Sequence, residues 1–459
     1  MTAQPASAGS SETELAVAGS AQPAEVLPLS LHQAEYLPPG FARATNVPIL
    51  AARFSAGLDA DRLAEALTSV QQRHPALRLR LVPGGQSIAP QPAPVERVSL
   101  PGSPDDAALL AEFERVLAER RDLAADGPAA ARLYSFDGGF AALFAVTHVA
   151  ADGWSVGVLG RDLAASYRGE ELPPLEPGYY RNYLLAQQDA GPALTDRQAE
   201  FFRSSLTGVP ALPLRRELPA EPAAAYRAVR RPLPPDVAAG VYRLAGQLRS
   251  TPAKLLMAAT LLALKGYFGA DRFAVLEVSA ARGRDQSDWA GLFSKGVPVP
   301  VPPSDLTAGE FVAEVHRHSL RALTMLAGPY SLKRVLTLLH SGGGSPAGEA
   351  LYRRHWTELP PDAHSVMFNC LIIAPPSDAP FGSEVEYRAL YPAEPLAAEK
   401  NRISDLDVLP LIDGTSISLG ITAHPALHDE QDLETLLSRL EQILTRWATD
   451  WDPDRPLAG

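Results

Sequence analysis

The sequence predicts a protein of the α/β (α+β) class, built as two lobes that each combine helices with a mostly antiparallel or mixed sheet. Three observations lead to this prediction. The chain has 459 residues, which suits two domains of ordinary size. Both halves alternate between helical and strand-like patterns, as mixed architectures do. Pro173, Pro174 and Pro177 interrupt the alternation, and we place the lobe boundary there because proline ends regular structure.

The chain divides into a tail and two lobes. Residues 1–26 are rich in Ala, Ser, Gly and Pro and contain few large apolar side chains, so we expect a disordered tail. Their pattern is not that of a signal peptide, because no basic start precedes an apolar core. Residues 27–178 are expected to form the N-terminal lobe and residues 179–459 the C-terminal lobe.

The N-terminal lobe begins with a predicted helix over residues 58–74. Its apolar side chains recur at helical spacing, and Asp59 or Asp61 can cap its first turn. The elements that follow are a strand over 76–82, a helix over 105–124, a hairpin over 131–148 with its turn at Asp137-Gly138-Gly139, and a helix over 153–169.

The C-terminal lobe repeats the alternation. We expect a strongly apolar helix over 253–269, a strand over 272–281 and a closing helix over 430–448. Residues 338–350 are rich in glycine and predict a flexible surface loop.

Composition bounds the partners and the compartment. The net charge of −12 argues against binding to nucleic acid or to an anionic membrane surface. No segment is long and apolar enough to cross a membrane. Cys370 is the single cysteine, so no disulfide can form within the chain, which fits a cytoplasmic location. It lies in the apolar run "VMFNCLII" and is expected to be a buried free thiol.

Residues 147–155, "THVAADGWS", resemble the HHxxxDGWS signature of nonribosomal peptide synthetase condensation domains. Further segments resemble other parts of that family and follow in the family's order. They are "LSLHQAEYL" (29–37), "GLDADRLAEALTSVQQRHPALRLRL" (57–81), "YYRNYLLAQQ" (179–188), "FFRSSLTGVPALPLRRELP" (201–219), "TPAKLLMAATLLALKGYFGADRFAVLEVSAARGR" (251–284), "AGLFSKGVPVPV" (290–301) and "SDLDVLPLIDGTSISLGITAHPALHD" (404–429). The ordered set is far more specific than any one segment.

The resemblance implies the chloramphenicol-acetyltransferase-like fold, with two lobes in a V and a central tunnel. It also implies an acyltransferase of natural-product biosynthesis. Donor and acceptor would arrive as thioesters on the phosphopantetheine arms of peptidyl carrier proteins, so the chain itself would hold no cofactor. One condensation unit uses the whole chain and leaves no adenylation or carrier domain. We therefore expect a freestanding enzyme, a monomer, that meets its carriers in trans.

Two positions depart from the family pattern. Thr147 stands where the first motif histidine is found, and the family's Asn after its "FV" pair is replaced within "FSKG". Successive side chains of a strand point to opposite faces, so Thr147 faces away from the tunnel if His148 faces it. We therefore expect Thr147 to change packing or a hydrogen bond behind the strand.

His148 is the expected catalytic residue. Its ordinary pKa of about 6.5 leaves it neutral near pH 7 and able to accept a proton. A neutral imidazole could orient an attacking amine or take its proton during aminolysis of a thioester. Positioning of two tethered substrates could contribute as much, and the sequence does not separate these roles.

The residues after His148 have expected roles in shaping the site. Asp152 precedes a helix and can cap it, and the resemblance pairs it with an arginine of the second lobe, Arg282 or alternatively Arg284. Gly153 would let a substrate arm approach the backbone, and its N–H could bind the thioester carbonyl. A simple turn glycine is the alternative.

Four more residues belong to the expected site. Trp154 and Ser155 complete the motif, with Trp154 expected in core packing rather than in chemistry. Asn369 matches a family position on a strand near the tunnel, and Ser294 is a second candidate for its lining.

The remaining histidines suggest no metal site. His316 and His318 are two residues apart on a predicted helix and therefore diverge. His424 and His428 lie across a loop that contains proline and lack a clear third ligand.

Three functions fit these residues. The leading prediction is a condensation enzyme that joins a carrier-bound acyl or peptidyl thioester to an amine, giving an amide. One alternative is an ester-forming relative or acyltransferase with a hydroxyl or a free small-molecule acceptor, which would use the same residues. The other is a non-catalytic condensation-like docking module. The intact His148 and Asp-Gly argue against the module, whereas Thr147 leaves it open. An epimerase or heterocyclising relative fits less well, because the heterocyclising type needs Asp at position 147.

Overall fold

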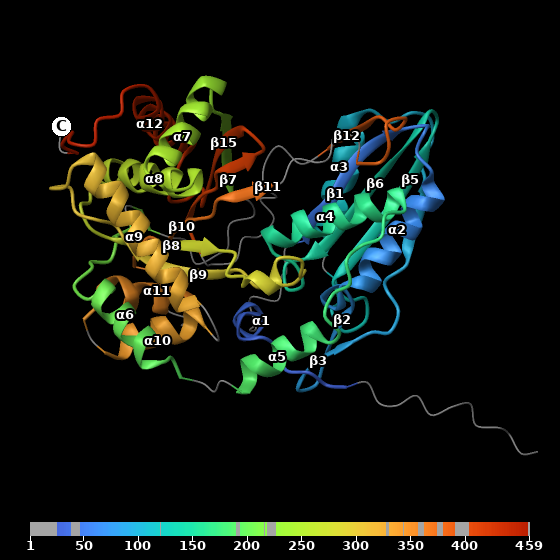
Figure 1. Ribbon diagram of the computed structural model, residues 1–459, viewed down its shortest axis with the longest axis horizontal. Coiled ribbons are helices and arrows are strands. Elements are labelled where there is room, and N and C mark those ends of the chain that lie inside the picture. The colour runs from blue at the N-terminus through green and yellow to red at the C-terminus, as the bar shows by residue number, and fades with distance from the viewer. Residues whose placement is uncertain are drawn as a thin grey trace, which may run out of the picture.

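The computed structural model shows two lobes that meet in a V (Figure 1). It describes residues 25–37, 46–119, 121–189, 193–214, 216–217, 226–326, 330–342, 344–356, 362–373, 380–390 and 404–457. Residues 1–24 of the expected tail lie outside the described residues. Backbone pairing of Leu27 with Gln86 ties the start of the described chain to the first lobe.

A five-stranded sheet forms the centre of the first lobe. Its order is β12 (Tyr387–Ala389), β1 (Asn46–Ser55), β6 (Gly139–Thr147), β5 (Ala129–Phe136) and β4 (Val95–Ser99). The neighbours are antiparallel except β4 and β5, which are parallel. The expectation of a mostly antiparallel sheet is therefore confirmed for this lobe. The hairpin of β5 and β6 turns at Asp137-Gly138, with Phe136 opposite Gly139.

Helices cover both faces of this sheet because successive side chains of its strands point to opposite faces and are apolar on both. Ala142, Phe144 and Val146 of β6 pack toward α2 (Ala60–Arg73) and α4 (Gly153–Arg168). The residues between them, Leu143 and Ala145, pack toward α3 (Asp106–Leu117). This alternation decides the direction of every side chain at the end of β6. Smaller elements beside the sheet are α1 (Leu31–Tyr36), η1 (Pro75–Arg78), β2 (Leu79–Val82), β3 (Gly85–Ile88) and α5 (Tyr179–Asp189).

The second lobe is built on an eight-stranded mixed sheet. Its order is β11 (Leu371–Ile373), β14 (Leu411–Asp413), β15 (Ser416–Ala423), β13 (Leu406–Val408), β10 (Val366–Phe368), β8 (Ala274–Ser279) and β9 (Lys295–Pro300), and β7 (Arg227–Pro232) also pairs with β15. One core unites this sheet with α7 (Pro235–Gln247), α8 (Pro252–Phe268), α9 (Ala308–Leu326) and α12 (Glu430–Thr449). A second gathers α6 (Asp196–Leu206), α10 (Leu332–Ser341) and α11 (Pro346–Trp356). The short helix η2 (Arg284–Gln286) follows β8.

Local signals placed the start of α2 and both ends of α4. Asp59 caps α2 by accepting from the N–H groups of Asp61 and Arg62. Asp152 caps α4, and Gly169 ends it in the left-handed conformation at φ 73°.

Three expected elements differ from the structure. The helix expected over 105–124 ends at Leu117, because the carbonyl of Leu123 accepts from the N–H of Leu81 in β2. The strand expected over 76–82 starts as a 3₁₀ turn led by Pro75. The loop expected over 338–350 is largely helical, since α10 continues to Ser341 and α11 begins at Pro346.

The expected lobe boundary at residue 178 does not hold for two segments. β12 crosses back from the second half and pairs with β1, where it covers the edge of the first sheet. Helix α5 packs Tyr179, Tyr180 and Leu184 in one cluster with Leu27 of the first lobe and with Trp289 of the loop after β8, so it contacts both sides of the expected boundary. Non-local pairing of this kind carries no local sequence pattern.

Among the described residues, no helix combines the length and the apolarity that a membrane crossing needs.

Candidate active site

His148 lies immediately after the last residue of β6, in a turn closed by the N–H of Ala150 on the carbonyl of Thr147. Its ring is partly exposed and stacks at a tilt on Tyr36 of α1, with the ring centroids 5.2 Å apart. Its Nδ1 atom is buried and has no hydrogen-bond partner. The imidazole is therefore held by packing and keeps its polar capacity for another molecule.

Burial lowers the pKa of His148 below its ordinary value, because a charged imidazole loses its hydration there. The backbone of His148 itself and the negative charge of Asp152 oppose this shift but do not cancel it. His148 is therefore neutral at pH 7 and can accept a proton. The two residues form no hydrogen-bonded dyad, since the Asp152 carboxylate binds other groups.

The structure places Thr147 behind the strand. Its side chain is 1% exposed and its hydroxyl donates to Oδ1 of Asn46 at 3.0 Å. The amide of Asn46 donates in turn to the carbonyls of Leu117 and Glu119 at the end of α3. Thr147 thus takes part in a hydrogen-bond chain on the α3 face, away from His148.

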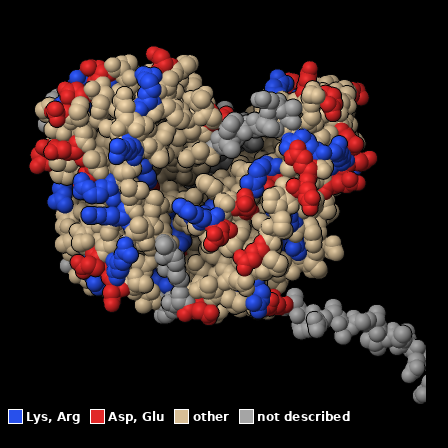
Figure 2. Space-filling model, viewed as in Figure 1, with Lys and Arg blue, Asp and Glu red and all other residues tan. Residues whose placement is uncertain are grey.

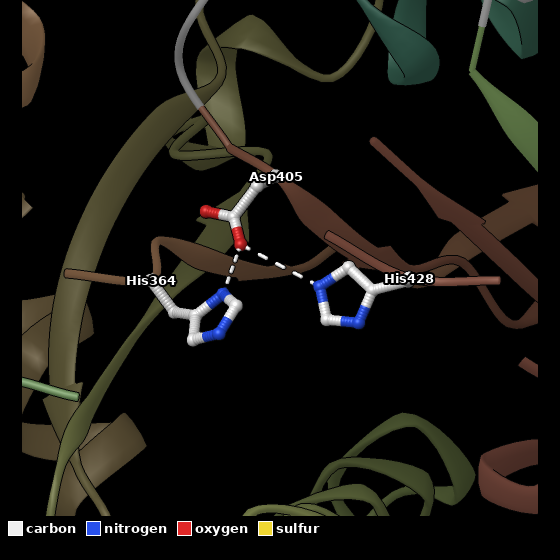
Figure 3. Close-up of side chains that lie close together, drawn as sticks. All are labelled: His364, Asp405 and His428. Carbon is white, nitrogen blue, oxygen red and sulfur yellow. Dashed lines mark hydrogen bonds and ion pairs between the residues drawn. The ribbon is translucent and has the colours of Figure 1, made fainter. Parts of the chain in front are cut away.

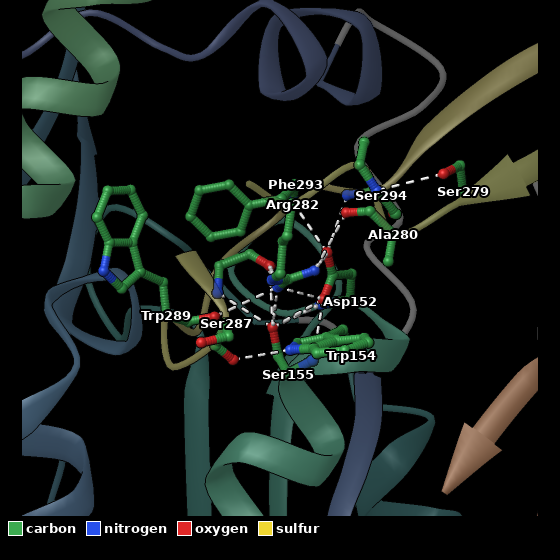
Figure 4. Close-up of polar contacts among 12 residues, drawn as sticks. Asp152, Trp154, Ser155, Ser279, Ala280, Arg282, Ser287, Trp289, Phe293 and Ser294 are labelled. Carbon is green, nitrogen blue, oxygen red and sulfur yellow. Dashed lines mark hydrogen bonds and ion pairs between the residues drawn. The ribbon is translucent and has the colours of Figure 1, made fainter. Parts of the chain in front are cut away.

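The Asp152 carboxylate is the centre of a buried group of ion-pair and hydrogen-bond contacts between the lobes (Figure 4). We call this group the clasp; its residues are Asp152, Ser155, Arg282, Phe293 and Ser294. Arg282, which follows β8, donates to both carboxylate oxygens, at 2.9 Å to Oδ2 and 2.8 Å to Oδ1. The N–H groups of Phe293 and Ser294 donate to Oδ2 at 3.0 and 2.8 Å. Both partners of the ion pair are nearly inaccessible, at 4% and 0% side-chain exposure. Arg282, and not Arg284, is therefore the partner.

Ser155 completes the clasp. Its N–H and hydroxyl donate to Oδ1 of Asp152 at 3.0 and 2.8 Å, and its Oγ also contacts the backbone of Gly291. Burial on its own would raise the pKa of Asp152, but Arg282 and these N–H donors outweigh it and hold that pKa below its ordinary value. Asp152 is a charged group that shapes the site, not a base.

Gly153 is the first residue of α4, and its N–H has no partner within the helix. The residue is exposed, and a Cβ atom placed on it would meet Cδ2 of Leu371 at 3.0 Å. Glycine therefore lets Leu371 of β11 approach the start of α4 closely, beside a helix N-terminus that favours negative charge.

The expected core packing of Trp154 is wrong. The side chain is 47% exposed. Its indole N–H donates to the carbonyl of Ser287 at 2.9 Å, and the guanidinium of Arg282 lies 5.9 Å from its ring centroid. As the second residue of α4, Trp154 lies across the junction of the lobes and braces the loop after β8.

Helix α1 contributes residues that the sequence did not single out. Figure 1 shows it between the two lobes. Gln33 donates to the carbonyl of Val149 at 3.2 Å and to Tyr180 at 3.1 Å, which fixes the backbone next to His148. Tyr36 covers the His148 ring. Both residues lie in the segment 29–37, and the resemblance of this segment to the family was the sequence signal that could have indicated them.

Lys295 lies within the "FSKG" segment, in which the sequence departs from the family pattern. It is 7% exposed, and its ammonium donates to the carbonyl of Leu326 at 3.0 Å. Burial lowers its pKa to about 8, although the Glu35 carboxylate opposes the shift. Glu35 accepts from the hydroxyl of Ser331 and from the N–H of Lys333, which connects α1 to the second lobe.

The last two expected residues lie in the second lobe. Ser294 is 8% exposed and serves the clasp through its N–H. Asn369 follows β10, is half-buried, and donates its backbone N–H to Val408. The next residue, Cys370, is a free thiol whose pKa burial raises to about 12, so it is no nucleophile at neutral pH.

A family model described as "Condensation domain" matches residues 42–341, well over half of the chain. The chain belongs to the condensation-domain family. This condensation domain is 32% identical over 327 residues to "Probable non-canonical nonribosomal peptide synthetase (NRPS) CymA" of Salinispora arenicola, a stretch that covers 65% of the chain and 4% of that protein. It is 29% identical over 292 residues to "Surfactin synthase subunit 1" of Bacillus subtilis, covering 60% of the chain and 8% of that protein.

Solved structures agree on the fold. SgcC5 of Streptomyces globisporus superposes with a TM-score of 0.71 at 22% identity, covering 94% of this chain and 100% of the other. The condensation domain of the Monacolin K polyketide synthase MokA superposes with a TM-score of 0.74 at 18% identity, covering 95% and 99%. The predicted two-lobed fold is therefore confirmed. The family acts in nonribosomal-peptide-type biosynthesis as acyltransferases that work with carrier-protein-bound substrates.

Another cluster of titratable groups lies in the second lobe, away from His148. His364, Asp405 and His428 are fully buried, and one ligand-type atom from each lies within 4.8 Å of the others (Figure 3). Arg354 binds the same carboxylate at 3.1 Å, and Tyr267 binds Nδ1 of His428 at 2.8 Å.

Arg354 already neutralises the Asp405 carboxylate, and the cluster forms a polar network that joins β13 to the loop before α12, although Nε2 of His364 and Nε2 of His428 are buried without a hydrogen-bond partner. The sequence did not foresee these partners for His428. The expectation of no metal stays a prediction.

Proposed function

We propose that this condensation domain joins a carrier-bound acyl or peptidyl thioester to an amine and releases an amide and a carrier thiol. The observation that carries the proposal is the neutral His148, with a buried and unpartnered Nδ1, at the junction of two lobes that Asp152 and Arg282 hold together. The surface is hollowed between the lobes (Figure 2), which gives substrate arms a way in.

The residues divide the work. His148 accepts the proton of the attacking nitrogen as the bond to the carbonyl carbon forms. The N–H of Gly153, at the start of α4, lies where a helix terminus can stabilise the oxyanion. Asp152 and Arg282 keep the turn that carries both residues in register with the second lobe. The cofactor arm belongs to the carriers, and the chain is proposed to hold none.

The test uses a donor carrier loaded with an acyl group, a panel of amine and alcohol acceptors, and mass spectrometry of the carrier. The wild-type chain should unload the donor and form a product with an amine acceptor. His148→Gln, which keeps the bulk of the side chain, should lower the rate at least about 100-fold. Equal rates for both chains would contradict the proposal.

An ester-forming reaction is the second candidate. SgcC5 was solved in complex with a naphthyl ethanediol, a molecule that offers hydroxyl groups. The alcohol arm of the same panel distinguishes the two, since product with alcohols alone would replace the amide with an ester.

A docking module is the third candidate. The X-domain from teicoplanin biosynthesis, solved in complex with OxyB, superposes with a TM-score of 0.71 at 23% identity. Unchanged donor masses with every acceptor would favour this candidate.

A further inference from the structure

Helix α1 brings a second histidine to the catalytic centre. His32 and Tyr36 are four residues apart and therefore lie on one face of the helix. The ring centroid of Tyr36 is 6.2 Å from that of His32 and 5.2 Å from that of His148. One aromatic ring thus contacts both imidazoles.

The charges around His32 show that it shares one poorly hydrated region with the proposed catalytic groups. Burial lowers its pKa to about 4, and positive charge on His148 or Lys295 lowers it further. The Asp152 carboxylate and the Ser294 backbone oppose the shift. His32 is therefore neutral at pH 7 and responds to the charge of His148.

Both histidines have an unused nitrogen. The Nδ1 atoms of His32 and His148 are buried without a hydrogen-bond partner. A neutral imidazole has one donor and one acceptor, and a buried polar atom left unpaired is costly. The Asp152 carboxylate cannot satisfy them because Arg282 and the clasp occupy it.

We propose, on the basis of the proposed function, that His32 accepts a hydrogen bond from the incoming nucleophile and holds it for attack while His148 takes its proton. An amine has two N–H bonds, so both imidazoles can be used at once. The C–N bond forms as the C–S bond breaks, and the proton passes from nitrogen through His148 to the leaving thiolate. A hydroxyl has one O–H, so an alcohol acceptor would use only one of the two imidazoles.

The activity test compares two variants of the full chain with the donor carrier and the amine acceptor of the panel. His32→Asn keeps an acceptor oxygen near the position of Nδ1 and should retain activity within about fivefold of wild type. His32→Leu removes the acceptor and should lower kcat/KM for the amine about 10- to 100-fold. A structural role would instead favour Leu, which suits a buried site. Equal activity of His32→Leu and wild type, or equal losses in both variants, would overturn the inference.

A second test needs no substrate. In NMR titrations, His148→Gln should raise the pKa of His32, because it removes a positive charge nearby. An unchanged pKa would overturn the inference. The matched control is His318 of α9, whose pKa burial likewise lowers to about 4 and whose Nε2 is also buried and unpartnered, but which stacks on Phe201 in the second lobe. His318→Leu should leave activity unchanged.

Failure of the inference and of the proposed function are distinguishable. A fully active His148→Gln contradicts the proposed function itself. An inactive His148→Gln beside an unaffected His32→Leu contradicts only the role of His32.

Discussion

Replacing Asp152 by Asn tests how much the interlobe clasp contributes to the fold. The substitution keeps the shape of the side chain and a residue type that also caps helices, so α4 retains its N-cap. It removes the negative charge that faces Arg282 and puts an amide NH₂ among donors. If this group replaces Oδ2, it meets the N–H groups of Phe293 and Ser294 and a guanidinium N–H of Arg282.

The magnitude follows from burial. Arg282 is 4% exposed in its side chain, so Asp152→Asn leaves a buried cation without its counter-charge. Breaking one side of such a pair costs about 3–5 kcal/mol. Arg282→Gln leaves Asp152 with its backbone and Ser155 donors and should cost less. The double variant removes both charges, and its loss should be smaller than the sum of the singles by about 2 kcal/mol.

Urea unfolding followed by tryptophan fluorescence measures these free energies. The control is Asp61→Asn, which breaks an ion pair with Arg97 whose side chains are 82% and 54% exposed, and which should cost little. Additive losses, or an Asp152→Asn variant as stable as the control, would refute the account of the clasp.

Three further predictions concern the motif. Burial lowers the pKa of His148. As the pH decreases, kcat/KM should therefore still have its neutral-pH value at pH 6.5 and decrease only at lower pH, where the ring gains charge. A decrease that begins above pH 6.5 would contradict this. Thr147→His should leave the rate within a few fold but lower stability by about 1–3 kcal/mol, because the bulkier ring must fit beside Asn46; a large gain in rate would show that position 147 acts in catalysis. Gly153→Val should lower kcat/KM at least about tenfold, because its branched side chain would stand beside the N–H that is proposed to meet the carbonyl, and it should also lower the unfolding midpoint slightly, because its Cβ would lie 3.0 Å from Leu371; a fully active variant would exclude close approach of the substrate there.

Local chemistry made part of the fold predictable. The Asp59 cap, the Asp137-Gly138 turn and the left-handed Gly169 each depend on residues near one another in sequence. The same holds for the direction of Thr147, since strand alternation alone sends it behind the sheet. By contrast, β12 is three residues long, and its pairing with β1 comes from a part of the chain more than 300 residues away.

The site was predictable where the family motif is continuous. His148, Asp152 and Ser155 lie within one strand–turn–helix, and resemblance supplied the distant partner Arg282. The exposure of Trp154 was not predictable, because it depends on how the loop after β8 crosses the lobe junction. The sequence contains His32 and Lys295, but no local pattern in it predicts that they lie near the site of His148.

The sequence by itself determined the family, the two-lobed class and the catalytic candidate, because an ordered set of segments resembles one family. It also determined several helix caps, a turn and the direction of Thr147, because short-range capping, turn chemistry and alternation encode them. Only the tertiary structure decided which groups surround that candidate. The Asp152 clasp, the seat of α1 between the lobes and the second imidazole of His32 arise from contacts between segments far apart in the chain. Such contacts depend on how both lobes pack, and burial then sets which nitrogens stay neutral and unpaired.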